Sequence, residues 1–171
     1  TAHGITIENA ANVVIQNLTN SGANDAIRAN GAGSVAVSNL IASGNSNHGL
    51  NVLNAGNVSI SNSTFASNDA DSDGEGRGVQ LLNVGDVVLN NVAAYGNDLG
   101  LAVGNAASFN DANGDYSNNT DHGLFLFDVA CNVTLSGTNL QNNDTNFDGK
   151  GDGLVIEDAL ATHAVSGDLV L

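Results

Sequence analysis

The run Gly49-Leu50-Asn51-Val52 decides the fold, because a glycine followed by a short apolar-rich run returns at regular intervals along the whole chain. The runs start at positions 4, 26, 49, 78, 100, 123 and 153, so the steps between them are 22, 23, 29, 22, 23 and 30. A period of this length is typical of a repeat protein in which each unit stacks on the next. The other copies are Gly4-Ile5-Thr6-Ile7, Ala26-Ile27-Arg28-Ala29, Gly78-Val79-Gln80-Leu81, Gly100-Leu101-Ala102-Val103, Gly123-Leu124-Phe125-Leu126 and Gly153-Leu154-Val155-Ile156.

Within each repeat, apolar and polar residues alternate in two short runs that are separated by a turn of small residues. This period of two predicts strands. Helices are disfavoured because the runs are short, β-branched and broken by glycine or asparagine. The same offsets recur, so we expect the inward side chains of successive repeats to stack. The inward candidates include Ile5, Ile7, Val13, Ile15 and Leu18 in the first repeat and Val79, Leu81, Val87, Leu89 and Val92 in the fourth.

Asparagine occupies two fixed positions of the repeat. Its side chain bonds to neighbouring backbone and it tolerates left-handed dihedral angles, as the corner of a coil requires. We therefore expect stacked asparagine ladders at two corners. One file contains Asn9, Asn54, Asn83, Asn105, Asp128 and Asp158, and the other contains Asn17, Asn39, Asn62, Asn91 and Asn113.

A unit of this length, with two or three short strands and asparagine corners, resembles the right-handed parallel β-helix of the pectate-lyase-like superfamily. The resemblance covers essentially the whole chain. It implies an all-β solenoid of about seven coils of 22–23 residues, with longer inserts in coils 3 and 6. It implies little about function, because folds of this kind carry unrelated activities.

The short repeats are grouped into a larger repeat of three coils. The separation between Gly4 and Gly78 is the same as that between Gly49 and Gly123. We expect one domain over residues 1–171, built from the superrepeats 4–77 and 78–152 and a final coil 153–171. Because the chain opens and stops within a repeat, we expect a segment of a longer or self-assembling protein. Duplication along a solenoid is more typical of structural or binding modules than of an active site.

The composition is strongly acidic, with a formal net charge of −15 and only three lysine or arginine residues. Nucleic acids and anionic membranes are therefore poor partners. No stretch approaches the roughly 20 apolar residues of a membrane span. The single cysteine, Cys131, excludes an internal disulfide.

Two acidic inserts, residues 68–76 and 143–152, account for the two long steps of the repeat. Both place oxygen-bearing side chains at alternate positions before a glycine, which is the arrangement that calcium requires. They resemble the D-x-[DN]-x-D-G calcium loops of EF-hands and of thrombospondin-type-3-like bacterial repeats. An EF-hand itself is excluded, because position twelve, where it needs a glutamate, holds Gln80 in the first insert and Val155 in the second.

We therefore predict calcium as the cofactor of both inserts. A solvated acidic loop at a coil corner is the alternative for each. The predicted ligands are Asp69, Asp71, Asp73 and Glu75 in the first insert and Asp144, Asn146, Asp148 and Asp152 in the second.

A third acidic stretch, Asp111-Ala112-Asn113-Gly114-Asp115, interrupts the fifth coil where other coils have a core strand. Its inward positions would hold Phe109 and then Asp111. We expect the strand to bulge here, and a weaker cation site is the alternative. In the last coil, we expect His163 at a core position aligned with Val133.

Together these features predict a calcium-stabilised structural or adhesive segment of an extracellular surface protein, fibre or surface layer. The expected partners are further repeats or copies of the chain stacked end to end, with surface glycans as a further candidate. We assign no catalytic residue. The histidines His3, His48 and His122 precede the leading glycine in separate coils, which argues against a transition-metal site.

The alternatives are a fragment of a β-helix polysaccharide lyase or hydrolase and a glycan-binding module. The resemblance to pectate lyases would imply aspartates that hold calcium near a basic residue, and Arg77 follows the first insert. An acidic sugar polymer would, however, meet a surface of its own charge.

Overall fold

The computed structural model describes residues 2–157 and 165–166, and this part of the chain consists of strands and turns without a helix. The described residues accordingly contain no helix that is long and apolar enough to cross a membrane. The strands are β1 (Ile5–Glu8), β2 (Val13–Ser21), β3 (Ile27–Asn30), β4 (Ser34–Ser43), β5 (Leu50–Leu53), β6 (Asn57–Ala66), β7 (Arg77–Tyr95), β8 (Leu99–Ala112), β9 (Leu124–Phe127), β10 (Val133–Ser136), β11 (Leu154–Glu157) and β12 (Val165–Ser166).

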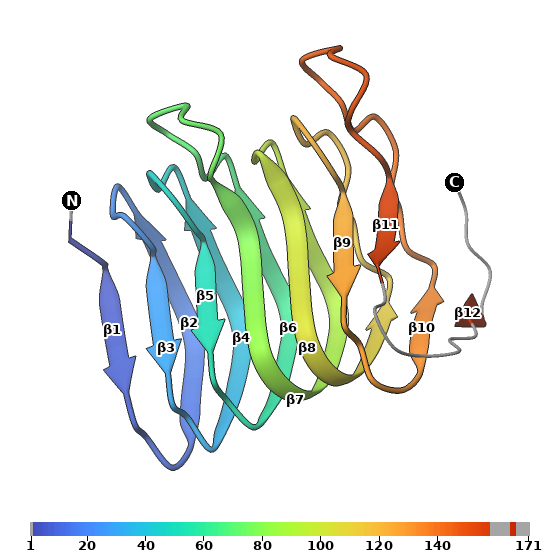
Figure 1. The fold of residues 1–171 in the computed structure, drawn as a ribbon. Coiled ribbons are helices and arrows are strands. Elements are labelled where there is room, and N and C mark those ends of the chain that lie inside the picture. Colours follow the sequence, from blue (N-terminus) through green and yellow to red (C-terminus); the bar gives the residue numbers. More distant parts are fainter. Residues whose placement is uncertain (1, 158–164, 167–171) are drawn as a thin grey trace.

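The chain winds around one axis as a parallel β-helix, so that each turn lies against the turn before it (Figure 1). One stack of parallel strands runs β1-β3-β5-β7-β8-β9-β11. The other runs β2-β4-β6-β7-β8-β10-β12. Strands β7 and β8 belong to both stacks because each continues round the corner between them (Figure 1).

The register of the first stack confirms the predicted coil spacing. Ile5 pairs with Ile27, and the same position then passes through Leu50, Val79, Leu101, Leu124 and Leu154. The described residues complete about six turns. Of the predicted final coil, the residues 158–164 and 167–171 lie outside the described part of the chain.

Inward side chains form one continuous apolar column along the axis. Val79, Leu81 and Val87 are fully buried, while Ile5 and Ile7 of the first coil are partly buried because a coil covers them on one side only. Full burial of a valine or leucine side chain contributes about 1.5–3 kcal/mol to folding. The column is therefore the main source of stability.

Both predicted asparagine files occupy corners with left-handed backbone. Asn54 and Asn83 have φ angles of 50° and 55°. Their side chains form a ladder in which Asn83 Nδ2 donates to Asn54 Oδ1 at 3.0 Å and Asn105 Nδ2 donates to Asn83 Oδ1 at 3.0 Å. The predicted corner role is confirmed for both files, except that Asp158 lies outside the described residues.

The acidic stretch 111–115 does not bulge, so that prediction is wrong. Asp111 stays in register with Leu89 on one side and Leu135 on the other, and its side chain is fully buried in the core column. Tyr116 Oη donates to Asp111 Oδ1 at 2.8 Å, and Thr138 Oγ1 donates to Asp111 Oδ2 at 2.6 Å. Because these hydroxyls satisfy both carboxyl oxygens, the strand accommodates a polar residue without leaving the sheet.

The predicted alignment of His163 with Val133 is also wrong, since Val165 is the register partner of Val133. The last coil has additional residues between β11 and β12. His163 itself lies outside the described residues.

Candidate functional site

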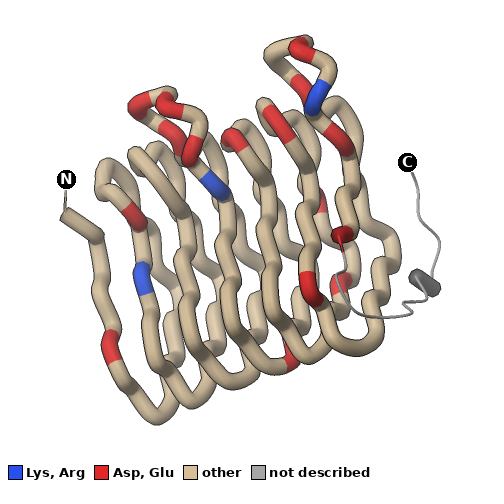
Figure 2. Tube along the Cα trace, viewed as in Figure 1, with Lys and Arg blue, Asp and Glu red and all other residues tan. Residues whose placement is uncertain are grey.

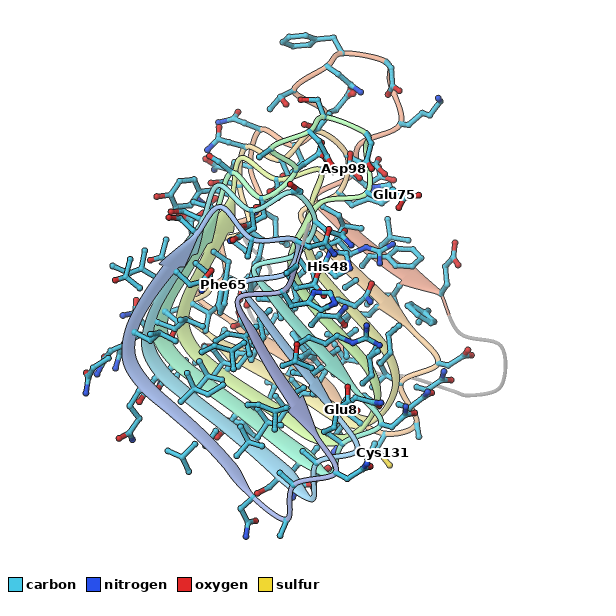
Figure 3. All side chains as sticks on the ribbon, turned by 90° about the vertical axis from the view of Figure 1, so that its left-hand side faces the viewer. Glu8, His48, Phe65, Glu75, Asp98 and Cys131 are labelled. Atoms are coloured by element: carbon cyan, nitrogen blue, oxygen red, sulfur yellow. The ribbon has the colours of Figure 1, made fainter. Side chains whose placement is uncertain are left out.

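Acidic residues gather along one corner of the rod, where both inserts project from the coils (Figure 2). The first insert leaves the coil after β6 and rejoins it at Arg77, the first residue of β7. The second insert precedes β11. Viewed along the rod, Glu75 and Asp98 lie at this corner, and Glu8 and Cys131 lie at the opposite one (Figure 3).

In the first insert, three of the four predicted ligands come together. Asp69, Asp71 and Asp73 each place a carboxylate oxygen within 4.8 Å of the other two. Partial burial raises the pKa of Asp69, and the charges of Asp73 and Asp71 act in the same direction, against a hydrogen bond from the Gly74 N–H. A cation would relieve this repulsion. Glu75 does not belong to the group; it is exposed, and its N–H donates to Asp73 Oδ1 at 3.1 Å.

The second insert repeats part of the backbone conformation of the first. The φ angle is 57° at both Ser72 and Phe147 and 79° at both Gly74 and Gly149. In each insert the glycine N–H donates to the first aspartate, Asp69 or Asp144, at 3.3 Å. The two inserts therefore share the turn that ends at Gly74 and Gly149, and they differ at the first aspartate, where φ is 123° at Asp69 and 73° at Asp144.

The second insert differs in charge. Asn146 stands where the first insert has Asp71, and its Oδ1 accepts a hydrogen bond from the Asp148 N–H at 3.2 Å. Lys150 stands where the first insert has Glu75, and its Nζ lies 3.4 Å from Asp148 Oδ2. The second insert therefore offers carboxylates of Asp144 and Asp148 and the amide of Asn146, with an ammonium group beside them.

The predicted ligand Asp152 lies at the base of the second insert, where the chain rejoins the coil. It is exposed, and its backbone N–H donates to His122 Nδ1 at 3.0 Å. Its backbone therefore takes part in the return of the insert to the coil.

A glycine closes the neck of each insert because the two arms touch there. A Cβ atom on Gly76 would lie 2.2 Å from the Cβ of Asp69, and one on Gly151 would lie 2.5 Å from the Cα of Asp144. Any other residue would force the arms apart and with them the oxygen atoms that they hold together.

A third asparagine column, which we did not predict, supports both inserts from inside. Asn68 donates to Asn97 Oδ1 from its backbone nitrogen at 2.9 Å and from Nδ2 at 3.1 Å. Asn97 makes the same pair of bonds to Asn119, at 3.1 and 3.3 Å. The sequence could have predicted this column, because one asparagine recurs in each coil at a nearly constant distance from the start of the repeat. The column consists of Asn45, Asn68, Asn97 and Asn119, which are buried, and Asn143, which is half-buried.

Between the two inserts lies a cleft of about 320 Å³. Burial raises the pKa of Asp98 to about 6; the charges of Asp121 and Asp69 also raise it, and those of Arg77 and His122 lower it. Sequence reasoning missed this cleft, because it exists only where two inserts project over the corners between them. The lining residues are Gly74, Asp98, Asp121, His122, Asn146, Asp148 and Lys150.

A small aromatic surface adjoins the cleft on the outside of β9. The ring of His122 stacks on that of Phe125 with centroids 5.9 Å apart and an angle of 15° between the planes. The ring of Phe127 lies 5.4 Å from that of Phe125.

Comparison with known proteins matches the chain to a family. A family model described as "Right handed beta helix region" matches residues 3–168. No curated protein and no solved structure matches the chain. The matched range includes both inserts and all of the stacked strands.

Proposed function

We propose that this chain, which belongs to the right-handed β-helix family, is a calcium-stabilised structural or adhesive segment of an extracellular surface protein, fibre or surface layer. The observation that carries the proposal is the convergence of three carboxylates, those of Asp69, Asp71 and Asp73, in one short loop. Hard divalent cations prefer such oxygen-only donor sets. The shared turn in the second insert supports a second, weaker site.

The charge distribution supports the same function. Acidic residues line the insert corner, and the protein has three lysine or arginine side chains against 18 acidic ones. Extracellular modules bind calcium with dissociation constants of about 10⁻⁴–10⁻³ M, which suits the millimolar calcium outside cells. Calcium would offset carboxylate repulsion along this corner and order the two inserts.

End-to-end contacts are the partner interaction that this function requires. In the described structure, β1 and β2 pair with a neighbouring strand on one side only, and an unpaired strand edge is a template for a further strand. We propose further repeats, or copies of this chain, as the partners at such edges. Surface glycans are the second candidate partner.

A thermal melt tests the calcium proposal. We would compare the protein with excess chelator and with calcium at about ten times the dissociation constant, where each site contributes about 1.4 kcal/mol. For two sites, the melting temperature should rise by about 6–12 °C. The double variant Asp71→Ala, Asp148→Ala should lose most of this rise.

The matched control is the double variant Glu8→Ala, Asp86→Ala, which removes two acidic groups away from the inserts. It should keep the full calcium response. If calcium leaves the melting temperature of the parent protein unchanged, calcium has no structural role here. If the control loses the response as well, the effect is general charge screening.

Binding or cleavage of a polysaccharide is the second candidate, and the cleft between the inserts favours it. There Asp98, with its raised pKa, and Asp121 lie beside the aromatic surface of His122 and Phe125. A carboxyl group with a raised pKa is suited to donate a proton, and aromatic rings pack against sugar faces. Release of reducing ends from a polysaccharide panel would show an enzyme, and a sugar-dependent melting shift without release would show a binding module.

A further inference from the structure

Each acidic insert rejoins the coil beside a histidine of the preceding coil. The backbone N–H of Arg77, where the first insert ends, donates to His48 Nδ1 at 3.4 Å. The N–H of Asp152, where the second insert ends, donates to His122 Nδ1 at 3.0 Å. The same contact therefore occurs at both returns.

We propose that His48 and His122 are positioning residues that fix the return of the two inserts, each as a neutral imidazole with its proton on Nε2 and its Nδ1 accepting a backbone N–H. The inference rests on the proposed function only in holding that the inserts bind calcium. The imidazole contacts themselves are independent of any metal.

The neighbouring coils show why an acceptor is needed at this corner. At one return without an insert, the Leu99 N–H donates to the main-chain oxygen of Gly76 at 3.2 Å. In the second coil, a side chain is the acceptor, since the backbone N–H of His48 donates to Asp25 Oδ1 at 3.2 Å. A histidine also accepts at a return without an insert, since the backbone N–H of Asp25 donates to His3 Nδ1 at 3.4 Å. The returns therefore take an acceptor from the preceding coil whether or not an insert precedes them, and at both insert returns that acceptor is an imidazole.

The surroundings of His48 favour the neutral form. The side chain is buried, and this burial lowers its pKa to about 4; Asp25 opposes the shift and Arg77 adds to it. A neutral imidazole has one ring nitrogen that accepts and one that donates. With Nδ1 accepting from Arg77, the proton belongs on Nε2.

His122 has a competing arrangement, which makes the assignment testable. Asp121 Oδ1 lies 3.5 Å from His122 Nδ1. A proton on Nδ1 would pair the ring with Asp121 and leave the Asp152 N–H without this acceptor. The shorter contact, to Asp152, favours the acceptor role.

The test is ¹⁵N NMR of the full chain with labelled histidine, in which long-range proton–nitrogen correlations report the tautomer directly. We expect both His48 and His122 as Nε2–H tautomers at neutral pH, in chelator and in calcium alike. A protonated Nδ1 at either residue would overturn the proposal for that residue. Variants that remove one histidine at a time assign the signals.

A conservative rescue separates positioning from bulk packing. His122→Ala should speed amide exchange at Asp152 about tenfold, because its acceptor is lost. His122→Asn, which keeps an acceptor near the position of Nδ1, should restore protection; His48→Ala and His48→Asn should behave likewise at Arg77. Unchanged exchange in the alanine variants, or no rescue by asparagine, would overturn the role.

The calcium response distinguishes this inference from the proposed function. If calcium stabilises the protein, His122→Ala should weaken the contribution of the second insert and spare that of the first. If calcium has no effect on the parent protein, the proposed function fails, while the tautomers and the exchange rates still decide the role of the histidines.

Discussion

The buried asparagine column gives a sharp prediction, because its middle member can be removed with a calculable effect. In the variant Asn97→Ala, the backbone N–H and Nδ2 of Asn68 lose the oxygen to which they donate, and the carbonyl of Phe65 loses the donor Nδ2 of Asn97 at 3.1 Å. Each buried polar group left without a partner costs about 1–3 kcal/mol. Allowing for partial relaxation, we expect a loss of about 3–6 kcal/mol in the free energy of unfolding.

The assay is urea denaturation followed by far-ultraviolet circular dichroism, with excess chelator present throughout so that metal binding does not contribute. The matched control is Asn91→Gly, in an exposed file. Asn91 has a φ angle of 55° and makes a 3.0 Å ladder bond to Asn62, and glycine keeps the left-handed backbone accessible. The control should lose only about 1 kcal/mol, since water replaces the lost bond.

The comparison between the two variants decides the reasoning. If Asn97→Ala is no more destabilising than Asn91→Gly, the buried column does not satisfy polar groups that would otherwise be stranded. Because a solenoid loses cooperativity more easily than a globular domain, the slope of the urea transition should be reported with its midpoint. A lower slope would mean that the coils on either side of Asn97 unfold separately.

Three further perturbations have definite expected results. The pKa of Asp98 is raised to about 6 in the folded protein. Ionisation of Asp98 therefore opposes folding, and the free energy of unfolding should fall as the pH rises from about 4 through 6. In thermal melts, the variant Asp98→Asn should accordingly be more stable than the parent protein at pH 8 and should lose this advantage near pH 4. A Cβ on Gly56 would lie 1.9 Å from a main-chain oxygen of the preceding coil, so Gly56→Ala should cost at least about 1–3 kcal/mol in urea denaturation. Asp111→Leu alone should destabilise by about 1–3 kcal/mol because two hydroxyls and the Gly114 N–H lose their acceptor. The triple variant with Tyr116→Phe and Thr138→Val should recover most of this loss in urea denaturation, because only the Gly114 N–H then lacks a partner.

The fold could be predicted from the sequence because, in a parallel β-helix, the spacing of the repeats determines which residues pair in neighbouring coils. Ile27 and Leu50 hold the same place in consecutive repeats of the sequence and are register partners in the sheet. The left-handed backbone at the corners could also be predicted locally. Asparagine favours a positive φ angle at its own position, as at Asn54 and Asn62. Neither inference needs knowledge of distant contacts.

The sequence interpretation was wrong or incomplete where the role of a residue depends on side chains that reach it from other parts of the fold. A carboxyl at Asp111 reads as an interruption of the core, and only the three-dimensional structure shows that Tyr116 and Thr138 satisfy it. The cleft at Asp98 likewise depends on two inserts that project over the same corner. The buried asparagine column was readable in principle, because Asn45 and Asn68 repeat in phase, but its asparagines read as ordinary turn residues.

The buried column also explains why both inserts occur at this corner. Asn68 and Asn143 are the last residues before the chain leaves the coil. The first insert lies between Asn68 and Asn97, and these two side chains are nevertheless hydrogen-bonded. The same hydrogen bond joins Asn97 to Asn119, although no insert lies between them. The stack is therefore held by side chains that precede the point of insertion, and the length of chain beyond them does not alter it. At the other two corners, the turn residues themselves form the ladder, so an insertion there would break it. This corner can accordingly gain acidic loops while the apolar column stays continuous.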